Sequence, residues 1–417
     1  MSAGLAQVET SIDQLGHFLP EDDYVLVQNC FRHFDVERIG KSGLHLSLFQ
    51  MPGAFSFGHI ERQITIQRMW HLATRRLGIE PGRLWATYFA GGEIAGNYFE
   101  EDIDTCRAWQ NVGLPKERII ALGGDHNFWK QGGGIDGQET SRKCGPNTEL
   151  FYDRGSQLSC GLDCGPGCGC GRFVEFANSL FILAEIDAET NVLSPLEVPF
   201  TETVIGTERV AMLLGGRPTV FEIETVKPLV EKLRVFYPDQ RSEISFNVQE
   251  SERILVDHLR AALFLVADGA PSPGKGGRRR LMRILIRRIL AQMKALQIDS
   301  PECLPVLIDL VITLDRNQHP NLGRGRDTLL AYIEAERPAF ERTLSRGYHQ
   351  LNRLLARNNG RALHTRELVS LVKQFGVPVS LLKVALARKG IEFPEYEYSR
   401  AIEQWRREIS GSTAASH

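Results

Sequence analysis

Apolar positions fall in short runs over the first half of the chain and follow a longer period afterwards. The early runs, rich in aromatic and β-branched residues, lie at 24–28, 83–89, 179–186 and 219–223. This composition favours strands, and the glycine-rich segments between several of the runs favour turns. We therefore predict a strand at each of the four positions.

From about Glu243 onward, apolar residues recur every three to four positions, which is the period of an amphipathic helix. This period predicts helices over 250–267, 278–296, 327–356 and 365–373. The glycines at 274–277 should separate the first two helices, and Gly376-Val-Pro378 should stop the last one.

The expected fold is therefore α+β: an antiparallel domain over 1–235, followed by a helical domain over 236–417. The chain of 417 residues is long enough for two or three domains. The net charge of −2 is unevenly placed, because residues 251–296 hold ten Lys/Arg against three acids. This local excess indicates either a polyanion-binding surface or a solvated helix face.

The N-terminus has no basic region followed by an apolar run, so we expect no signal peptide. The most apolar stretches, at 261–267 and 304–314, are too short to span a bilayer. On these grounds we expect a soluble, cytoplasmic protein.

Four closely spaced cysteines mark a glycine-rich insert at about 156–171. They follow the pattern Cys160-x3-Cys164-x3-Cys168-x-Cys170, which is compact enough for four thiolates to converge on Zn²⁺. Cys144 is a possible substitute for one ligand. The alternative is a glycine-rich turn with incidental free thiols. A zinc ion here would be structural, since four thiolates leave no open position.

Four motifs follow one another in the sequence: Asn127-Phe-Trp-Lys130, Cys144-Gly-Pro-Asn-Thr-Glu-Leu-Phe-Tyr-Asp153, Phe173-Val-Glu-Phe-Ala-Asn178 and Ile205-Gly-Thr-Glu-Arg-Val210. Together they resemble the catalytic domain of alanyl-tRNA synthetases, class II enzymes that activate alanine with ATP. Segments 254–269, 280–288, 340–347 and 375–378 resemble the family's helical domain, which recognises the tRNA acceptor stem. The resemblance implies a class II antiparallel sheet, ATP and Mg²⁺ as cofactors, and a small amino acid and tRNA as substrates.

The resemblance also implies which residues hold ATP. Arg209 matches the third-motif arginine that binds the phosphates, with Glu208 beside it. Phe57 falls in the second motif and is assigned to ATP. His45, also in the second motif, is a catalytic candidate. Leu44, however, stands where the family has an arginine on the α-phosphate, and Gln50 replaces a glutamate. Lys41 or Arg38 is a candidate to supply the missing cation.

By the same resemblance, five residues form the amino-acid pocket: Trp129, Glu175, Asn178, Glu202 and Gly206. Trp129 would be an apolar wall, and Glu202 replaces the family aspartate that pairs with the substrate ammonium. Because the Glu side chain is one methylene longer, it would shift the substrate by roughly a bond length and change which small amino acid fits.

In the helical half, the RNA-binding candidates are cations on one helix. Arg279, Arg283 and Arg287 are spaced to lie on one face, with Arg288 adjacent. Such a stripe suits the phosphates of an RNA stem. Gly277 replaces a family asparagine that helps read the acceptor stem, whereas Arg288 matches a family arginine.

At its ends the chain is shorter than the family pattern. Residues 2–7 resemble a segment inside the first class II motif, so the preceding helix and strand are expected to be missing. Either the start site is misassigned or this paralogue lost that edge. The editing domain and C-terminal extension find no counterpart.

Three functions remain open: a synthetase that charges tRNA, an adenylate-forming enzyme with a carrier protein or metabolite as acceptor, and a catalytically impaired paralogue that binds tRNA or ATP.

Overall fold

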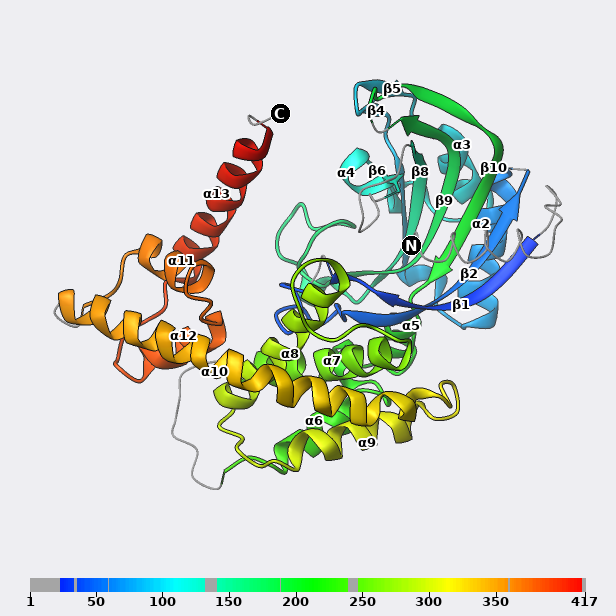
Figure 1. Ribbon diagram of the computed structural model, residues 1–417. Coiled ribbons are helices and arrows are strands. Elements are labelled where there is room, and N and C mark those ends of the chain that lie inside the picture. The colour runs from blue at the N-terminus through cyan, green and yellow to red at the C-terminus, as the bar shows by residue number, and fades with distance from the viewer. Residues whose placement is uncertain are drawn as a thin grey trace. The chain divides into compact units, whose positions relative to one another are not determined.

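The computed structural model describes residues 23–33, 36–58, 60–131, 141–187, 189–238, 247–358 and 361–414, the last nine as backbone only. The chain forms two compact units (Figure 1). The first extends to Ile223 and the second begins at Glu224, except that residues 37–41 belong to the second. Residues 2–7, which resemble part of the first class II motif, lie outside the described residues.

An eight-stranded sheet forms the centre of the first unit. Its strands are β1 (Asp23–Phe31), β2 (Leu48–Phe57), β3 (Leu84–Phe89), β6 (Ile119–Leu122), β7 (Phe128–Lys130), β8 (Ser141–Asp153), β9 (Phe173–Asp187) and β10 (Leu193–Ile205). The order is β1-β2-β10-β9-β8-β3-β6, with β7 also paired to β8, and every pairing except β3–β6 is antiparallel. The predicted antiparallel α+β fold is therefore confirmed.

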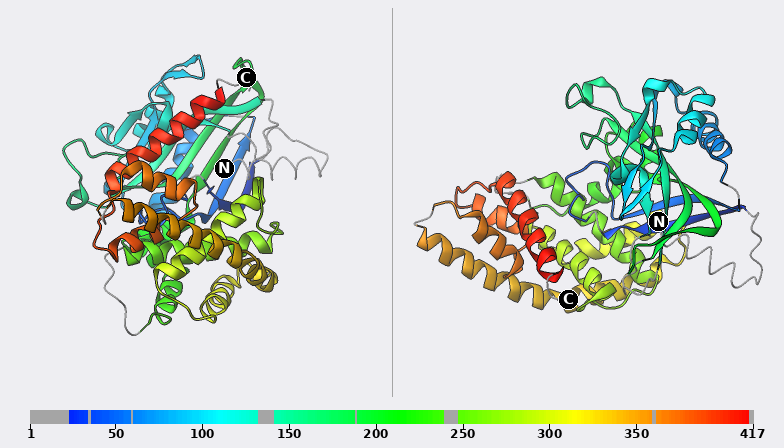
Figure 2. Two further views of the ribbon diagram at one scale, coloured as in Figure 1. Left: turned by 60° about the vertical axis from the view of Figure 1, so that its left-hand side comes forward. Right: turned by 90° about the horizontal axis from the view of Figure 1, so that it is seen from above.

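Helices cover one face of this sheet. The helices of the first unit are α2 (Arg62–His71), α3 (Ile103–Asn111), α4 (Gly124–Asn127) and α5 (Thr207–Leu214), and β4 (Gly92–Ile94) and β5 (Asn97–Phe99) form a separate hairpin. Ile66 and Met69 of α2 and Trp109 of α3 pack against residues of β3, β8 and β9 in one buried cluster. Figures 1 and 2 show α2 and α3 on the same side of the strands.

The opposite face of the sheet carries a second apolar cluster. Phe55, Leu180 and Phe200 are buried in it, and the half-buried Trp129 packs against it. Because successive side chains of a strand point to opposite faces, the polar residues that alternate in step with this cluster face the same side. The register therefore defines a face on which buried apolar and polar side chains meet.

The second unit is helical. Its helices are α6 (Lys227–Arg234), α7 (Val248–Ala267), α8 (Gly277–Ala295), α9 (Cys303–Asp315), α10 (Arg326–Arg357), α11 (Thr365–Lys373), α12 (Val379–Ala387) and α13 (Glu395–Ala414). The four predicted helices are confirmed as α7, α8, α10 and α11, with ends within two residues. Gly276 and Gly376 adopt positive φ angles of 77° and 70°, which glycine alone adopts without strain, so the predicted breaks have a backbone cause.

The strand predictions at 24–28, 83–89 and 179–186 are confirmed as parts of β1, β3 and β9. The strand predicted at 219–223 is wrong, because Val220–Glu222 forms a 3-10 helix. Val220 and Phe221 are buried, so the apolar composition there reflects burial and not strand pairing. Among the described residues, no helix combines the length and the apolar character needed to cross a membrane.

Candidate active site

Two rows of paired residues place polar side chains on the sheet face that carries the Phe55–Leu180 cluster. Glu202 of β10 lies opposite Leu180 of β9 on one side and Phe55 of β2 on the other. Two positions along, Asn178 of β9 lies opposite Glu149 of β8. Paired positions in an antiparallel sheet share a face, so the two carboxyl groups and the Asn178 amide face the same side as the Phe55–Leu180 cluster.

Arg209 joins this face from the first turn of α5. Its guanidinium donates from Nη1 to the Glu175 carbonyl at 2.7 Å and to Glu175 Oε2 at 3.0 Å. Its Nε donates to the carbonyl of Leu44 at 3.3 Å. The side chain is 26% exposed, so a ligand can reach the guanidinium. The sequence motifs thus bring Arg209 and Glu175 together as a cation beside a carboxylate.

Glu149 is a site residue that the sequence reasoning did not single out. Burial, with a further contribution from the charge of Glu175, raises the pKa of Glu149 to about 9, although Arg209 acts in the opposite direction. At neutral pH this carboxyl group is therefore protonated and can donate a hydrogen bond. In the sequence Glu149 lies inside the motif Cys144–Asp153, and the structure buries the other residues of 144–151.

Glu208 and Phe57 have structural partners of their own. Both carboxylate oxygens of Glu208 accept from the backbone N–H of Gln50, at 3.1 and 3.0 Å, which ties α5 to β2. Phe57 is buried and stacks on Phe200 with ring centres 5.1 Å apart. Glu208 and Phe57 are both buried, whereas the Arg209 side chain is 26% exposed.

Glu202 is the most enclosed of the predicted pocket residues. It is 1% exposed, and its Oε1 has no hydrogen-bond partner among the described residues. Burial raises the pKa of Glu202 to about 7. A buried carboxylate oxygen without a partner is destabilising unless a ligand or water binds it, and a cation is the partner that best favours its ionised form.

The remaining pocket residues lie on neighbouring strands. Asn178 is buried and its Oδ1 accepts from Asn147 Nδ2 at 3.4 Å. Trp129 pairs with Gly145 between β7 and β8 and packs on the apolar cluster. The N–H of Gly206 donates to the Phe176 carbonyl at 2.9 Å, which fixes the start of α5.

Leu44 and His45 precede β2. Ser42 Oγ accepts from the Leu44 N–H at 3.1 Å and lies 2.7 Å from His45 Nδ1. Arg38 and Lys41 belong to the second unit. Arg32, which follows β1, belongs to the first unit, and its N–H donates to the Ser47 carbonyl at 2.8 Å. Arg32 is an exposed cation close to the Leu44 segment that the sequence reasoning overlooked, although its position at the end of a predicted strand was visible.

The four cysteines of the insert converge. Their sulfur atoms all lie within 4.8 Å of one another, with Cys160 and Cys168 at 3.2 Å and Cys164 and Cys170 at 3.5 Å. The loop joins β8 to β9, and a bidentate ion pair of Arg172 with Asp153, at 2.7 and 2.8 Å, closes its base. The geometry is that of a four-sulfur donor set for a thiophilic metal.

The predicted RNA-binding arginines of α8 differ in their surroundings. Arg283 and Arg287 both donate from Nε to one carboxylate oxygen of Glu336 on α10, at 3.1 and 2.6 Å. Arg288 pairs with Glu37 at 3.3 Å, and Arg279 is exposed. The stripe therefore both fixes α8 to α10 and presents cations to solvent.

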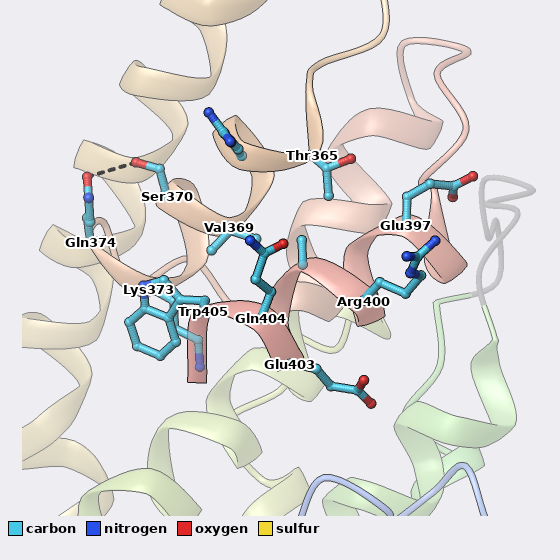
Figure 3. A pocket seen from close by; sticks show the side chains of 12 residues that line it. Thr365, Val369, Ser370, Lys373, Gln374, Glu397, Arg400, Glu403, Gln404 and Trp405 are labelled. Atoms are coloured by element: carbon cyan, nitrogen blue, oxygen red, sulfur yellow. Dashed lines mark hydrogen bonds between the residues drawn. The ribbon is translucent and has the colours of Figure 1, made fainter. Parts of the chain in front are cut away.

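A groove of about 840 Å³ lies between α11 and α13 of the second unit (Figure 3). Lys373 lies over the ring of Trp405, 4.9 Å from its centroid, and Arg366 and Arg400 also line the groove. Two glutamates, Glu397 and Glu403, line it as well. The groove combines an aromatic face with three cations, and no sequence motif indicated it.

Comparison with known proteins gives consistent matches. Residues 1–416 match the family model of class II (A) tRNA synthetases. The alanine–tRNA ligase of Alkaliphilus metalliredigens is 32% identical over 393 residues, which are 93% of this chain and 42% of that protein. The alanine–tRNA ligase of Dehalococcoides mccartyi is 30% identical over 426 residues, 100% of this chain and 46% of that protein. The chain spans less than half the length of these curated relatives.

Among solved structures, a pyrrolysyl tRNA synthetase of Desulfitobacterium hafniense shows 12% identity and a TM-score of 0.27, covering 54% of this chain and 52% of its own. A TM-score this low supports no detailed comparison.

Proposed function

Because the chain belongs to the class II tRNA synthetase family, we propose that it activates alanine or another small amino acid with ATP and transfers it to the 3′ end of a tRNA. The observation that carries this proposal is the joint placement of Arg209, Glu175, Glu149 and Glu202 on one sheet face. In this proposal, residues 1–235 carry the activation chemistry and 236–417 bind the tRNA.

In the activation step, a carboxylate oxygen of the amino acid attacks the α-phosphorus of ATP, and the bond from that phosphorus to the β-phosphate oxygen breaks. Negative charge grows on the phosphate oxygens, and a fixed cation at that place stabilises it. Arg209 is suited to this role because it is held by Glu175 and is still partly exposed.

Glu175 and Glu149 fit a magnesium ion by donor chemistry, because carboxylate oxygens are the ligands that Mg²⁺ prefers. Burial and the charge of Glu175 raise the pKa of Glu149, and a bound cation would favour the ionised form of this carboxyl group. When bound, Mg²⁺ would offset the charge of the ATP phosphates.

Glu202 is the proposed partner of the substrate ammonium. Its unpartnered Oε1 is buried beside the apolar cluster on which Trp129 packs. A small side chain against Trp129 and a cation on Glu202 describe a small α-amino acid. The length of Glu202 favours a substrate positioned differently from alanine on an aspartate, so glycine and serine are candidates beside alanine.

The helical unit is proposed to bind RNA. Two guanidinium groups share the single carboxylate of Glu336, which leaves net positive charge on α8 for RNA phosphates. Trp405 in the α11–α13 groove offers a stacking surface for an unpaired base.

A structural zinc ion on Cys160, Cys164, Cys168 and Cys170 completes the proposed set of cofactors. We expect about one zinc per chain, because ligation by several thiolates couples metal binding to folding. Elemental analysis of untagged protein measures this. Cys164→Ser should lose the metal, whereas the matched control Cys303→Ser, at a buried cysteine of the second unit, should keep it. Metal-free protein with four freely titrating thiols would refute the site.

The proposed function is tested by amino-acid-dependent pyrophosphate exchange over a panel of amino acids, followed by charging of tRNA. Exchange with one small amino acid and charging of its tRNA are expected. Exchange without charging would point to another acceptor, such as a carrier protein or metabolite.

The position of Leu44 favours a second candidate function, a catalytically impaired paralogue. In place of a guanidinium, Leu44 offers its carbonyl to Arg209. Binding of ATP and RNA without any exchange would support this candidate.

A further inference from the structure

The second half of α10 carries a row of buried residues along one face. The row consists of Phe340, Leu344, Gly347, Leu351 and Leu355. Gly347 lies so close to Val377 that no larger residue would fit at its position. This face of the helix is therefore packed against the rest of the helical unit.

An exposed row of basic residues repeats the same spacing two positions later. Its members are Arg342, Arg346, His349, Arg353 and Arg357. Because each residue turns an α-helix by about 100°, a shift of two positions places this row about 200° from the buried one. At about 1.5 Å of rise per residue, the line of side chains is about 22 Å long. We call it the outer row of α10.

The two halves of α10 differ in how their positive charges are compensated. In the first half, Arg326 pairs with Asp309 and Arg337 pairs with Glu334. In the outer row, none of the four arginines forms an ion pair with a described residue. The segment 342–366 contains six arginines, no lysine and no acid. The outer row is therefore a concentrated positive surface in a protein whose net charge is −2.

Helix stability does not account for the outer row. The negative end of a helix dipole favours cations in the last turn, which includes Arg357 but not Arg342 or Arg346, about three to four turns earlier. Arg342 and Arg346 also lie four residues apart, and like charges at this spacing destabilise a helix. A bound polyanion would remove this repulsion.

We propose that the outer row of α10 binds the phosphate backbone of an RNA helix, an inference that rests on the proposed binding of tRNA by the helical unit. Arginine suits this role better than lysine, because its planar guanidinium group can donate two hydrogen bonds to one phosphate. A nucleic-acid helix presents closely spaced phosphates along its whole length, which matches a straight line of cations. A folded protein surface instead mixes acids with bases.

Contacts to phosphates add affinity and orientation without reading bases. The outer row therefore differs in role from the Trp405 groove, where a base would stack. It would hold RNA of any sequence, and its contribution would depend strongly on salt.

The test compares two double variants that remove the same charge from one helix. Arg346→Gln with Arg353→Gln changes the outer row. The matched control, Arg326→Gln with Arg337→Gln, changes two partly exposed arginines of α10 that already have acidic partners. Fluorescence anisotropy measures binding of each full-length protein to a labelled RNA duplex longer than the row, over a series of KCl concentrations.

The outer-row variant should lower the slope of log affinity against log salt by about 2 and weaken binding at low salt by about 10-fold to 100-fold, because two phosphate contacts are lost. The control should keep the wild-type slope. An equal loss of slope in both variants would mean that only net charge matters, and an unchanged slope in the outer-row variant would mean a solvated helix face. Either result would overturn the proposal.

A second outer-row variant, Arg346→Lys with Arg353→Lys, separates charge from folding. It should keep the wild-type slope and bind several-fold more weakly, because lysine contacts a phosphate as a point charge without the planar fork. A slope as low as that of the glutamine variant would show that the helix had been disturbed and would overturn the proposal.

Two further measurements distinguish the partner and the proposed function. Unlabelled RNA duplex should displace the labelled duplex, whereas poly-L-glutamate at the same charge concentration should not; equal displacement would assign the outer row to an acidic protein and overturn the proposal. A wild type that binds no RNA would overturn it as well. Absence of amino-acid-dependent pyrophosphate exchange in the wild type, with the slopes as predicted, would overturn only the proposed function.

Discussion

Arginines lie in both units of the molecule, and the acids around them leave different charge balances. In the sheet unit, Arg209 is the cation beside two carboxyl groups, Glu175 and Glu149, one of which stays protonated. In the helical unit, Arg283 and Arg287 share the single carboxylate of Glu336. The carboxyl groups beside Arg209 can bind a further cation, and the two arginines that share Glu336 can bind an anion.

This difference shows that an arginine in a phosphate-binding sequence context acts through its neighbours as well as its own charge. The acids near Arg209 position it and suit a divalent cation with nucleotide phosphates. The shared glutamate on α10 leaves α8 net positive, which suits the phosphates of a polynucleotide. If the comparison is correct, changes at the two places should affect different substrates.

The largest effect is expected for Arg209→Ala. Removing the cation that is proposed to hold the ATP phosphates should lower amino-acid-dependent pyrophosphate exchange by about 10³-fold, while thermal unfolding stays cooperative. Arg107→Ala is the control, because Arg107 forms an exposed ion pair with Asp104 on α3. Near-normal exchange in Arg209→Ala would mean that this arginine does not bind ATP, and the comparison would fail at its first half.

Leu44→Arg tests whether the sheet unit lacks a cation. If the chain is an impaired synthetase, the new guanidinium should raise adenylate formation by about 10-fold to 10³-fold, because it can bind the α-phosphate in a bidentate way. The gain should be smaller if Arg32 already supplies that charge. Adding Arg32→Gln to the Leu44→Arg protein measures the contribution of Arg32 to exchange. Unchanged or lower exchange in a stable Leu44→Arg protein would show a site reshaped around leucine.

The pH dependence of amino-acid binding tests Glu202. Its pKa of about 7 means that the carboxylate is mostly protonated at pH 6 and mostly ionised at pH 8. Because an ammonium binds the ionised form, the apparent KM for the amino acid should fall about 10-fold between these pH values. Glu202→Gln should show a high KM without this pH dependence. A flat profile in the wild type would exclude Glu202 as the ammonium partner.

The smallest effect is expected for Arg279→Ala in the helical unit. This exposed side chain should contribute to RNA binding, so its loss should weaken binding of an alanine tRNA several-fold and lower the slope of affinity against salt by about 1. Exchange and stability should not change. Glu336→Gln should instead destabilise the unit, because it removes the shared partner of Arg283 and Arg287. Identical tRNA affinity of Arg279→Ala and wild type would remove Arg279 from the interface.

Local periodicity predicted the parts of the fold that depend on local sequence. The helices α7, α8, α10 and α11 follow from apolar spacing and glycine breaks, and β1, β3 and β9 from β-branched runs. The segment 219–223 has strand-like composition but lacks a strand partner, and composition alone does not reveal pairing.

The candidate site shows the same limit. Arg209, Glu175 and Glu202 could be named from motifs, because each motif is contiguous in the chain. Glu149 and Arg32 were missed because their positions depend on contacts between segments that are not adjacent in sequence. The burial of Glu149 becomes visible only when the strands are aligned.

The most direct test of the central claim is amino-acid-dependent exchange of labelled pyrophosphate into ATP by the wild-type protein with Mg²⁺ and single small amino acids. The account predicts exchange that requires alanine, glycine or serine and that Arg209→Ala lowers by about 10³-fold. Exchange that is absent with every small amino acid, in protein that binds ATP, would contradict the claim that this sheet face forms an aminoacyl-adenylate.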